Sequence, residues 1–453
     1  MDRRRRPGAD AGVAAPAAPA EPVTEPVTEP VTERSTGALA DPTYRRLLAA
    51  RTVAMAGNAL TLVALPVLVY RLTGSATLTA LIAAAETAPY LVVGLPAGAL
   101  ADRWNRRRVL AGTGAASGLA LLTVPVADLL GVLTFAQLLG VALVISTLFV
   151  FADAASFGLV PQLVGRDRVA SATSTLVTVG TAIGLVGPLV AGLLVTTTSP
   201  ALVLGIDGLA YLVAAAVVAR LRWPGSESVP DAVHGRRLGR EVGEGLRYLW
   251  AMPVVRWLTV LGTGASLAGG ATSGLLVVVG VEQLGLASDS PALGWLFAAG
   301  ALGTFVASLA LPRVQRRLGV GLITTAGYAV ALLALLALAA SSTVVVALPL
   351  LAVLNFAMTT LIVNGIVTRQ VVTPDHLQSR VNTTARLIAW GGSPLGAALG
   401  GVVAGAAGTP WALRAAALGL LASLIGALLV GVPRFARLDV LRAEALGGNY
   451  YPR

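Results

Sequence analysis

Twelve long apolar segments, separated by short polar breaks, fill the chain from about residue 48 to residue 432. Each segment is close to the roughly 17–25 residues that an α-helix needs to cross a bilayer core. Composition agrees, because only 12% of the residues are charged, against about 25% in typical soluble domains. The pattern predicts an all-α integral membrane protein. The expected transmembrane helices are 48–70, 77–101, 108–128, 132–154, 169–196, 201–221, 254–281, 291–312, 319–340, 343–367, 381–406 and 411–432.

The arginines are distributed unevenly between the two sides of these spans. The chain has 33 basic and 22 acidic residues, a net charge of +11, and every basic residue is Arg. Only Arg71 and Arg414 lie in or beside the breaks that follow odd-numbered spans; the others belong to the opposite side. By the positive-inside rule the arginine-rich side is cytoplasmic. We therefore expect a multi-pass protein of the cell (inner, cytoplasmic) membrane, with both termini cytoplasmic and no nucleic-acid binding.

Polar segments divide the chain into five parts. The N-terminal one holds three copies of EPVT, in which a Pro at every fourth position prevents helix formation. We expect this tail to be disordered. The expected parts are a disordered cytoplasmic tail at 1–43, a six-helix bundle at 44–222, a cytoplasmic linker at 223–253, a second six-helix bundle at 254–433 and a cytoplasmic tail at 434–453.

The linker contains an amphipathic pattern in the segment RRLGREVGEGLRYLW (236–250). Leu238, Val242, Leu246 and Leu249 recur at spacings of 4, 4 and 3, with arginines among them. This spacing places the apolar residues on one face of a helix. We expect that helix to lie on the inner leaflet; a solvated linker helix is the alternative.

The two halves of the chain resemble each other. Arg103-x-x-Arg106-Arg107, after the second span, is repeated 210 residues later as Arg313-x-x-Arg316-Arg317. LVGPLVAG (185–192) in the fifth span is similar to GGSPLGAA (391–398) in the eleventh. Matching motifs in two halves of six helices are typical of duplicated transporters.

The segment GALADRWNRRRVL (98–110) resembles motif A of the major facilitator superfamily. Asn105 stands where that family usually has Gly, and in the second half Pro312 takes the place that corresponds to Asp102. The resemblance covers 44–435 and is strongest to the exporter branch that includes enterobactin exporters and macrolide efflux pumps. LPAGALADR, TPDHLQSRVNTTAR (373–386) and WGGSPLGAALGG (390–401) support that branch. It implies the major facilitator fold, with two pseudo-symmetric six-helix bundles.

The resemblance also implies a conformational latch at the inner end of span 2. In it, Asp102 caps the helix dipole of span 11 near 379–381, and Arg106 pairs with Asp153 when the inner side is shut. The alternative is that these arginines only orient the protein. The expected latch residues are Gly98, Asp102, Arg103, Arg106 and Asp153.

Two glycine-rich stretches each allow two interpretations, one functional and one in terms of helix packing. Gly187, Pro188 and Gly192 in span 5 partly match the antiporter motif, with Ala191 in place of a Gly. The same residues also permit bending and close helix approach. Span 7 contains GTGASLAGGATSG (262–274), which either unwinds as a gate or packs tightly against a neighbour.

Acidic residues within the spans are candidates for function, because a carboxylate in hydrocarbon is unfavourable. Glu86 lies near the middle of span 2, where a carboxyl group removed from water can load and release a proton. The alternative for Glu86 is a neutral carboxyl that makes an interhelical hydrogen bond. Asp207, in span 6, either binds a cationic substrate or bonds a neighbour; we favour the neighbour.

Neutral polar residues and one Arg complete the candidate set. The resemblance places spans 1, 4, 7 and 10 around a central cavity, and therefore suggests Asn58, Gln137 and Asn355 as cavity residues. Each also fits an interhelical hydrogen bond. Arg386 lies one turn before Trp390, and either stacks on that indole or contacts an anionic substrate.

Several classes of chemistry are excluded. The chain has no Cys and two His, which leaves no thiolate chemistry and little for a metal site. It has no Lys, which a P-loop requires. We expect no enzyme and no cofactor, but a monomeric secondary transporter whose partners are a small molecule, protons and the bilayer.

The preferred function is proton-coupled efflux of a small amphiphilic compound such as a drug, siderophore or secondary metabolite, by alternating access. One alternative is an uptake facilitator or a lysophospholipid-type flippase that is not coupled to protons. The other is a membrane scaffold or sensor that transports nothing.

Overall fold

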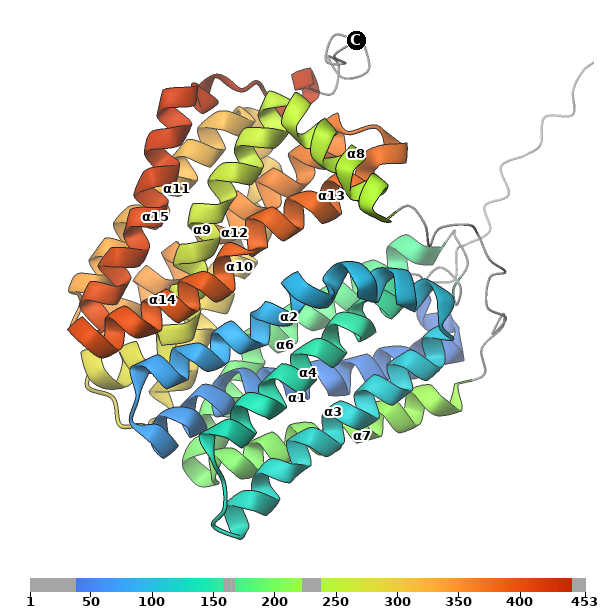
Figure 1. The fold of residues 1–453 in the computed structure, drawn as a ribbon, viewed down its shortest axis with the longest axis vertical. Helices are drawn as coiled ribbons and strands as arrows, with labels where there is room; N and C mark the ends of the chain where they lie inside the picture. Colours follow the sequence, from blue (N-terminus) through green and yellow to red (C-terminus); the bar gives the residue numbers. More distant parts are fainter. Residues whose placement is uncertain (1–37, 158–163, 165–167, 222–237, 442–453) are drawn as a thin grey trace, which may run out of the picture. The chain divides into compact units, whose positions relative to one another are not determined.

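The computed structural model describes residues 38–157, 164, 168–221 and 238–441 (Figure 1). Among them the secondary structure is helical, and twelve helices are long and apolar enough to cross a membrane. The expected all-α membrane fold is therefore confirmed. The first six spanning helices are α1 (Pro42–Thr73), α2 (Ala76–Arg103), α3 (Arg106–Leu129), α4 (Phe135–Phe157), α6 (Val169–Thr197) and α7 (Pro200–Arg220).

The remaining helices follow the linker helix α8 (Leu238–Ala251). They are α9 (Pro253–Val278), which the π-helix η3 (Val279–Gln283) continues, α10 (Ala292–Arg317), α11 (Val320–Ala340), α12 (Val344–Val372), α13 (Asp375–Trp390), α14 (Gly392–Ala407) and α15 (Thr409–Val430). We call α1 to α7 the N-terminal bundle and α9 to α15 the C-terminal bundle. The arginine-rich end carries the turn 104–105, and the arginine-poor end carries the turn 74–75.

The first spanning helix begins earlier than its apolar pattern suggests. The side chain of Asp41 accepts a hydrogen bond from the backbone N–H of Thr43 (2.7 Å), and Pro42 is the first helical residue. This is a strong helix start, because it satisfies a backbone donor that the helix itself leaves unpaired. A short 3-10 helix, η1 (Ala38–Ala40), precedes it. The expected disordered tail at 1–43 is therefore wrong for 38–43, and 1–37 lie outside the described residues.

Span 11 is interrupted near its middle. The expected span 381–406 is confirmed as the membrane-spanning stretch Thr384–Ala407, within which α13 ends at Trp390 and α14 begins at Gly392. Gly391 and Gly392 form the junction, and a Cβ on Gly392 would lie 2.8 Å from the backbone oxygen of Thr263 in α9. The missing side chain of Gly392 permits this close approach.

Span 7 is a continuous helix over its glycine-rich stretch. Helix α9 runs unbroken from Pro253 to Val278, and two of its glycines lie where other backbones approach. A Cβ on Gly264 would lie 2.2 Å from the oxygen of Gly419, and one on Gly270 would lie 2.0 Å from that of Ser393. In this structure the stretch packs tightly and does not unwind.

The linker helix docks on protein with part of its apolar face. Leu249 is fully buried in a cluster with Met252, Val372 and Val381, and the hydroxyl of Tyr248 donates to the oxygen of Val372 (2.7 Å). Leu246 and Trp250 stay exposed. The helix expected at 236–250 is therefore present as α8, and one side of it is fixed to the C-terminal bundle.

The two bundles contact each other closely at the arginine-poor end. A Cβ on Gly192 of α6 would lie 2.8 Å from the Cα of Gly294 in α10, so the two backbones touch. The hydroxyl of Thr77 in α2 donates to the oxygen of Gly401 in α14 (2.9 Å). Arg71 adds a rim contact, with its Nη2 3.0 Å from the oxygen of Ser288. Small residues on both sides make this approach possible.

The antiporter-like stretch of span 5 forms part of this contact. A Cβ on Gly294 would lie 2.5 Å from the oxygen of Pro188, and one on Gly187 would lie 2.5 Å from the Cβ of Ala59 in α1. Gly187, Pro188 and Gly192 therefore hold α6 close to a helix of its own bundle and to one of the other bundle.

Candidate functional site

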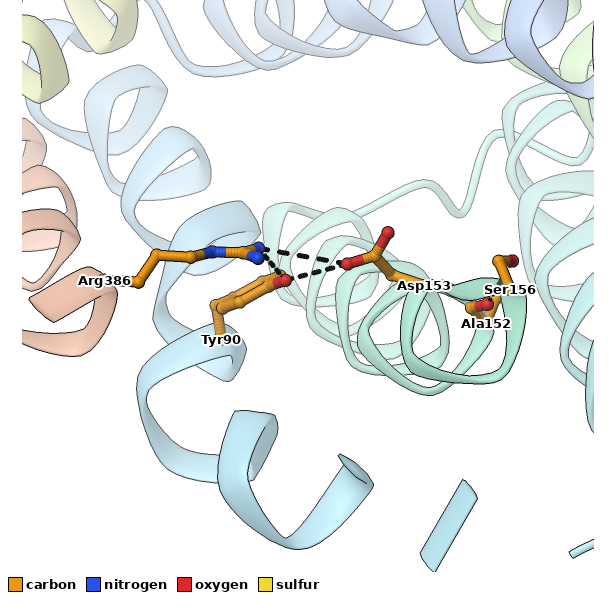
Figure 2. A network of polar contacts seen from close by, with 5 residues as sticks. All are labelled: Tyr90, Ala152, Asp153, Ser156 and Arg386. Atoms are coloured by element: carbon orange, nitrogen blue, oxygen red, sulfur yellow. Dashed lines mark hydrogen bonds and ion pairs between the residues drawn. The ribbon is translucent and has the colours of Figure 1, made fainter. Parts of the chain in front are cut away.

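A polar network joins the two bundles away from the glycine contacts (Figure 2). The hydroxyl of Tyr90 donates to Oδ2 of Asp153 (2.8 Å) and accepts a hydrogen bond from Nη2 of Arg386. The same nitrogen lies 3.9 Å from Oδ2 of Asp153. The guanidinium of Arg386 also stacks over the Tyr90 ring, 4.6 Å from its centre. A single C-terminal residue thus binds two residues of the N-terminal bundle, and we call these three residues the bridging network.

The three helices place the bridging network toward the arginine-rich end. Asp153 lies four residues before the end of α4, Arg386 lies in the last part of α13, and Tyr90 is in the middle of α2. About a third of each charged side chain is exposed, 29% for Asp153 and 35% for Arg386. A polar contact at such a partly exposed place contributes only about 1 kcal/mol or less to stability, because solvent screens it.

The bridging network changes the interpretation of two predicted residues. Arg386 stacks on Tyr90, whereas the side chain of its expected partner Trp390 lies outside the described part of the chain. The hydrogen bond and ion pair described for Asp153 go to Tyr90 and Arg386. Tyr90 was not predicted, since a lone Tyr in an apolar helix carries no signal of its own.

The motif A residues lie where α2 meets α3. Gly98, Asp102 and Arg103 belong to the last turns of α2, and the side chains of the latter two lie outside the described residues. Arg106 is the first residue of α3 and is half-buried. The cap by Asp102 and the pair between Arg106 and Asp153 stay predictions.

A cavity of about 140 Å³ lies inside the N-terminal bundle. Its polar lining includes Arg51, Asn58, Ser117, Asp153 and Tyr211, which come from α1, α3, α4 and α7. Arg51 was missed because, four residues into the first expected span, it looks like one more arginine of the cytoplasmic rim. Its guanidinium lies within electrostatic range of Asp153 and Tyr211.

The two predicted acids have different surroundings. Glu86 is half-buried near the middle of α2, and its carboxyl makes no hydrogen bond or ion pair with another residue in the described ranges. Asp207 is 1% exposed, and its Oδ2 accepts a hydrogen bond from Oγ1 of Thr61 in α1 (2.5 Å). Its Oδ1 has no partner there.

The three neutral polar candidates are not equivalent. Asn58 is exposed in the middle of α1 and lines the cavity. Asn355 is half-buried in α12, where its Nδ2 donates to the oxygen of Leu351 in its own helix (3.0 Å). The middle depth expected for Gln137 is wrong, because α4 begins only at Phe135. Gln137 therefore lies in the first turn, and its Nε2 donates to the oxygen of Thr123 (3.1 Å).

One ion pair lies outside the spans, beyond the end of α15. Arg437 and Asp439 are 2.7 Å apart and exposed, and the hydrogen bond from Arg437 lowers the pKa of the Asp439 carboxyl. Neither residue belongs to the bridging network.

Comparison with known proteins agrees with this architecture. The family model described as transmembrane secretion effector matches residues 34–447. The chain belongs to this family of the major facilitator superfamily. It is also 29% identical over 411 residues to the multidrug efflux pump Tap of Mycolicibacterium fortuitum, covering 87% of this chain and 96% of that protein. The predicted membership of the major facilitator superfamily is thus confirmed, and the chain is a multi-pass membrane protein.

Solved structures show the same fold at low identity. A bacterial homologue of the human lysosomal transporter Spinster, inward-facing and unoccupied, superimposes with a TM-score of 0.64 at 15% identity, over 90% of this chain and 97% of that one. The nucleoside transporter NupG gives a TM-score of 0.70 at 13% identity, over 86% and 99%. The family and these relatives are transporters, so a small-molecule substrate is implied.

Proposed function

We propose that the protein exports a small amphiphilic compound, such as a drug or secondary metabolite, by alternating access driven by the proton gradient. The similarity to multidrug efflux pumps over 87% of the chain supports the substrate class. In this proposal the arginine-rich end faces the cytoplasm and the protein works as a monomer in the cell membrane.

The observation that carries the proposal is the contrast between the two contacts that join the bundles. At the arginine-poor end, the backbones at Gly192 and Gly294 touch. Arg71 and Glu282 also bond across there, each to a neutral group of the other half. Toward the arginine-rich end, one Arg from the C-terminal bundle holds a Tyr and an Asp. Contacts that differ this much open under different conditions, as alternating access requires.

Glu86 is the proposed site of exchange between proton and substrate. A carboxyl without a described partner, on a helix that touches both α4 and α14, can bind either a proton or the cationic centre of a substrate. Asn58 and Asn355 lie at similar depth on α1 and α12 and are proposed to contact the substrate. The predicted Arg106–Asp153 pair is proposed to form when Arg386 leaves Asp153.

Inside-out vesicles that contain the protein, acidified inside and loaded with a pH-sensitive dye, test this function. We expect lipophilic cations, macrolides or siderophores to release protons from wild-type vesicles. We expect little response from the Glu86→Gln variant or from empty vesicles. Glu282→Gln is the matched control, because Glu282 lies at the arginine-poor rim, where its carboxylate accepts from Tyr70 (3.2 Å).

Two outcomes contradict the proposal in different ways. Transport that continues after the proton gradient is collapsed identifies a facilitator or flippase. Proton release that is equal in wild type and Glu86→Gln keeps the antiport and removes Glu86 from it.

A further inference from the structure

The N-terminal bundle has a buried acid where the C-terminal bundle has a hydroxyl. In the N-terminal bundle α1 crosses α7 at Gly57, and a Cβ there would lie 2.1 Å from Oδ1 of Asp207. In the C-terminal bundle α9 crosses α15 at Gly264, and a Cβ there would lie 2.1 Å from Oγ of Ser423. These are the first and last helices of each bundle, so the two crossings correspond. A Ser is enough for such a crossing, and packing therefore does not explain the carboxyl of Asp207.

The surroundings of Asp207 do not favour a permanent charge. The side chain is 1% exposed, and Thr61 supplies one hydrogen bond, at 2.5 Å, to Oδ2. The other oxygen has no partner among the described residues. A buried carboxylate with an unsatisfied oxygen is unfavourable. A proton on Oδ1 removes the charge and leaves the hydrogen bond from Thr61 in place.

The cavity of the N-terminal bundle leads from the arginine-rich end toward this acid. Leu47, Leu110 and Val218 line it near that end, and Asn58 and Tyr211 line it deeper in the bundle. Asn58 directly follows Gly57, and Tyr211 follows Asp207 by one helical turn. A cavity of about 140 Å³ with several polar groups on its wall is large and polar enough to hold water.

The charged and polar groups around Asp207 come from α1, α3 and α4. Helix α1 supplies Arg51, which interacts electrostatically with Tyr211. Tyr211 in turn interacts electrostatically with Asp207. Helix α3 has Ser117 on the cavity wall, with Arg106, Arg107 and Arg108 at one end and Asp128 at the other. Helix α6 has no titratable residue. Asp153 of α4 lines the far side of the cavity.

We propose that Asp207 is a protonation site inside the N-terminal bundle, separate from Glu86, and that the cavity is its route to water at the arginine-rich end. A proton from this water binds Oδ1 and forms the neutral acid; the reverse step returns it. Tyr211, whose hydroxyl both donates and accepts, is the proposed relay between the cavity and Oδ1. Coupling to transport rests on the proposed function; the site and its route do not.

Infrared difference spectroscopy of the purified protein during a pH change tests the site directly. We expect a C=O stretching band of a protonated carboxyl that shifts on ¹³C-aspartate labelling of the wild-type protein. The band should persist in Glu86→Gln and disappear in Asp207→Asn and Asp207→Ser. The Ser variant imitates the C-terminal crossing and should fold. Absence of an aspartate band in the wild type, or its persistence in a folded Asp207 variant, overturns the site.

Hydrogen–deuterium exchange of this band tests the route. Filling the cavity by Ser117→Leu should slow the exchange at least tenfold without removing the band, because Ser117 lines the cavity and the hydrogen bond described for Asp207 comes from Thr61 instead. Thr113→Ser, on the same wall, is the matched control and should exchange at the wild-type rate. Exchange that is equally fast in Ser117→Leu overturns the route.

Vesicle measurements separate this inference from the proposed function. If wild-type vesicles release no protons with any compound while the aspartate band is present, the proposed coupling fails and the site stands. If Asp207→Ser vesicles release protons like the wild type and the wild-type protein shows no aspartate band, the site fails and proton-coupled efflux stands.

Discussion

The two bundles have the same number of spanning helices but use polar groups differently. Asp153 in α4 and Asn364 in α12 occupy corresponding places, 211 residues apart, in the fourth spanning helix of each bundle. Asp153 is half-exposed and bonds across to the other bundle. Asn364 is fully buried and bonds only within its own: it accepts from Gln315 (2.9 Å) and donates to Val320 (3.1 Å) and Thr324 (3.0 Å).

At both pairs of corresponding positions, this one and that of Asp207 with Ser423, the N-terminal bundle has a carboxyl group and the C-terminal bundle a neutral one. Elsewhere the C-terminal bundle also buries a charge, at Arg369 of α12. A neutral amide is sufficient to join three helices of the C-terminal bundle, and a Ser is sufficient at its α9–α15 crossing. The acids Glu86, Asp153 and Asp207 are in the spans of the N-terminal bundle, and the Arg that bridges to it comes from α13. We infer that the C-terminal bundle acts mainly as a rigid body, and that the N-terminal bundle carries the groups whose charge or partner changes.

The largest expected effect comes from placing a carboxyl group in the C-terminal bundle at the position that corresponds to Asp153 of the N-terminal bundle. In Asn364→Asp a carboxylate oxygen replaces the NH₂ group that donates to Val320 and Thr324, and so faces a carbonyl oxygen. We expect a loss of about 3 kcal/mol or more in unfolding free energy. The loss should shrink at low pH, where the new carboxyl is protonated and donates again. Thermal unfolding in detergent at two pH values measures both.

The opposite substitution, from Asp to Asn at the corresponding position of the N-terminal bundle, serves as the control. Asp153→Asn keeps an acceptor for Tyr90 on a half-exposed side chain, so we expect a stability change of about 1 kcal/mol or less, with reduced transport. Equal destabilisation by Asn364→Asp and Asp153→Asn contradicts the distinction between a rigid and a changing bundle.

The two helix crossings should respond differently to an added methyl group. Gly57→Ala and Gly264→Ala should each lower the unfolding free energy by about 1–3 kcal/mol through overpacking. At Gly57 the closest obstacle is the Asp207 side chain, at 2.1 Å, so adding Asp207→Ala should restore stability. At Gly264 the oxygen of Gly419 lies 2.2 Å away as well, so Ser423→Ala should not. Rescue at both crossings, or at neither, contradicts this explanation.

Loss of Arg386 should open the arginine-rich end. Arg386→Ala removes an ion pair, a hydrogen bond and a stacked ring contact, together about 1–3 kcal/mol at a half-exposed site, and shifts the opening equilibrium about 5–150-fold. The chain has no Cys, so labels on Arg108→Cys and Arg317→Cys, both exposed at this end, report the distance between bundles. Arg386→Lys should give an intermediate shift, because it keeps the charge and loses the planar stacking. An unchanged distance distribution in Arg386→Ala argues against a role in gating.

The spans and the duplicated plan followed from the sequence, because the apolar length of a span is a direct consequence of the bilayer and the two halves repeat the same motifs. Single residues were predicted less well. The depth of Gln137 was wrong because the helix was predicted to begin three residues too early. Val132 and Leu133 are apolar and extend the apolar segment, but they precede α4. The interruption of the helix at Gly391 was not predicted. It lies beside the close approach of α9, and no local sequence pattern indicates which helix packs there.

The candidate site shows the same limit. Asp153 and Arg386 were candidates because charges in apolar helices are conspicuous, but their partnership joins residues 233 positions apart through Tyr90. Arg51 was hidden because an arginine near a cytoplasmic end has an ordinary explanation. Asp207 was conspicuous in the sequence as an acid within a span. Only a comparison with Ser423, at the corresponding crossing, shows that the crossing itself does not need a carboxyl group.

The smallest expected effect isolates the Tyr90 hydroxyl, which links the bundles within the bridging network. Tyr90→Phe keeps the ring under the Arg386 guanidinium and removes the group that donates to Asp153 and accepts from Arg386. We expect the opening equilibrium to shift by about 0.5–1.5 kcal/mol, roughly 2–10-fold, with the same distance labels as readout. In an Arg386→Ala background the same substitution should have little further effect, because Tyr90 then bonds only within its own bundle. Additive shifts in the double variant would instead place the hydroxyl's role inside the N-terminal bundle, and the contact between bundles would rest on Arg386 and Asp153 alone.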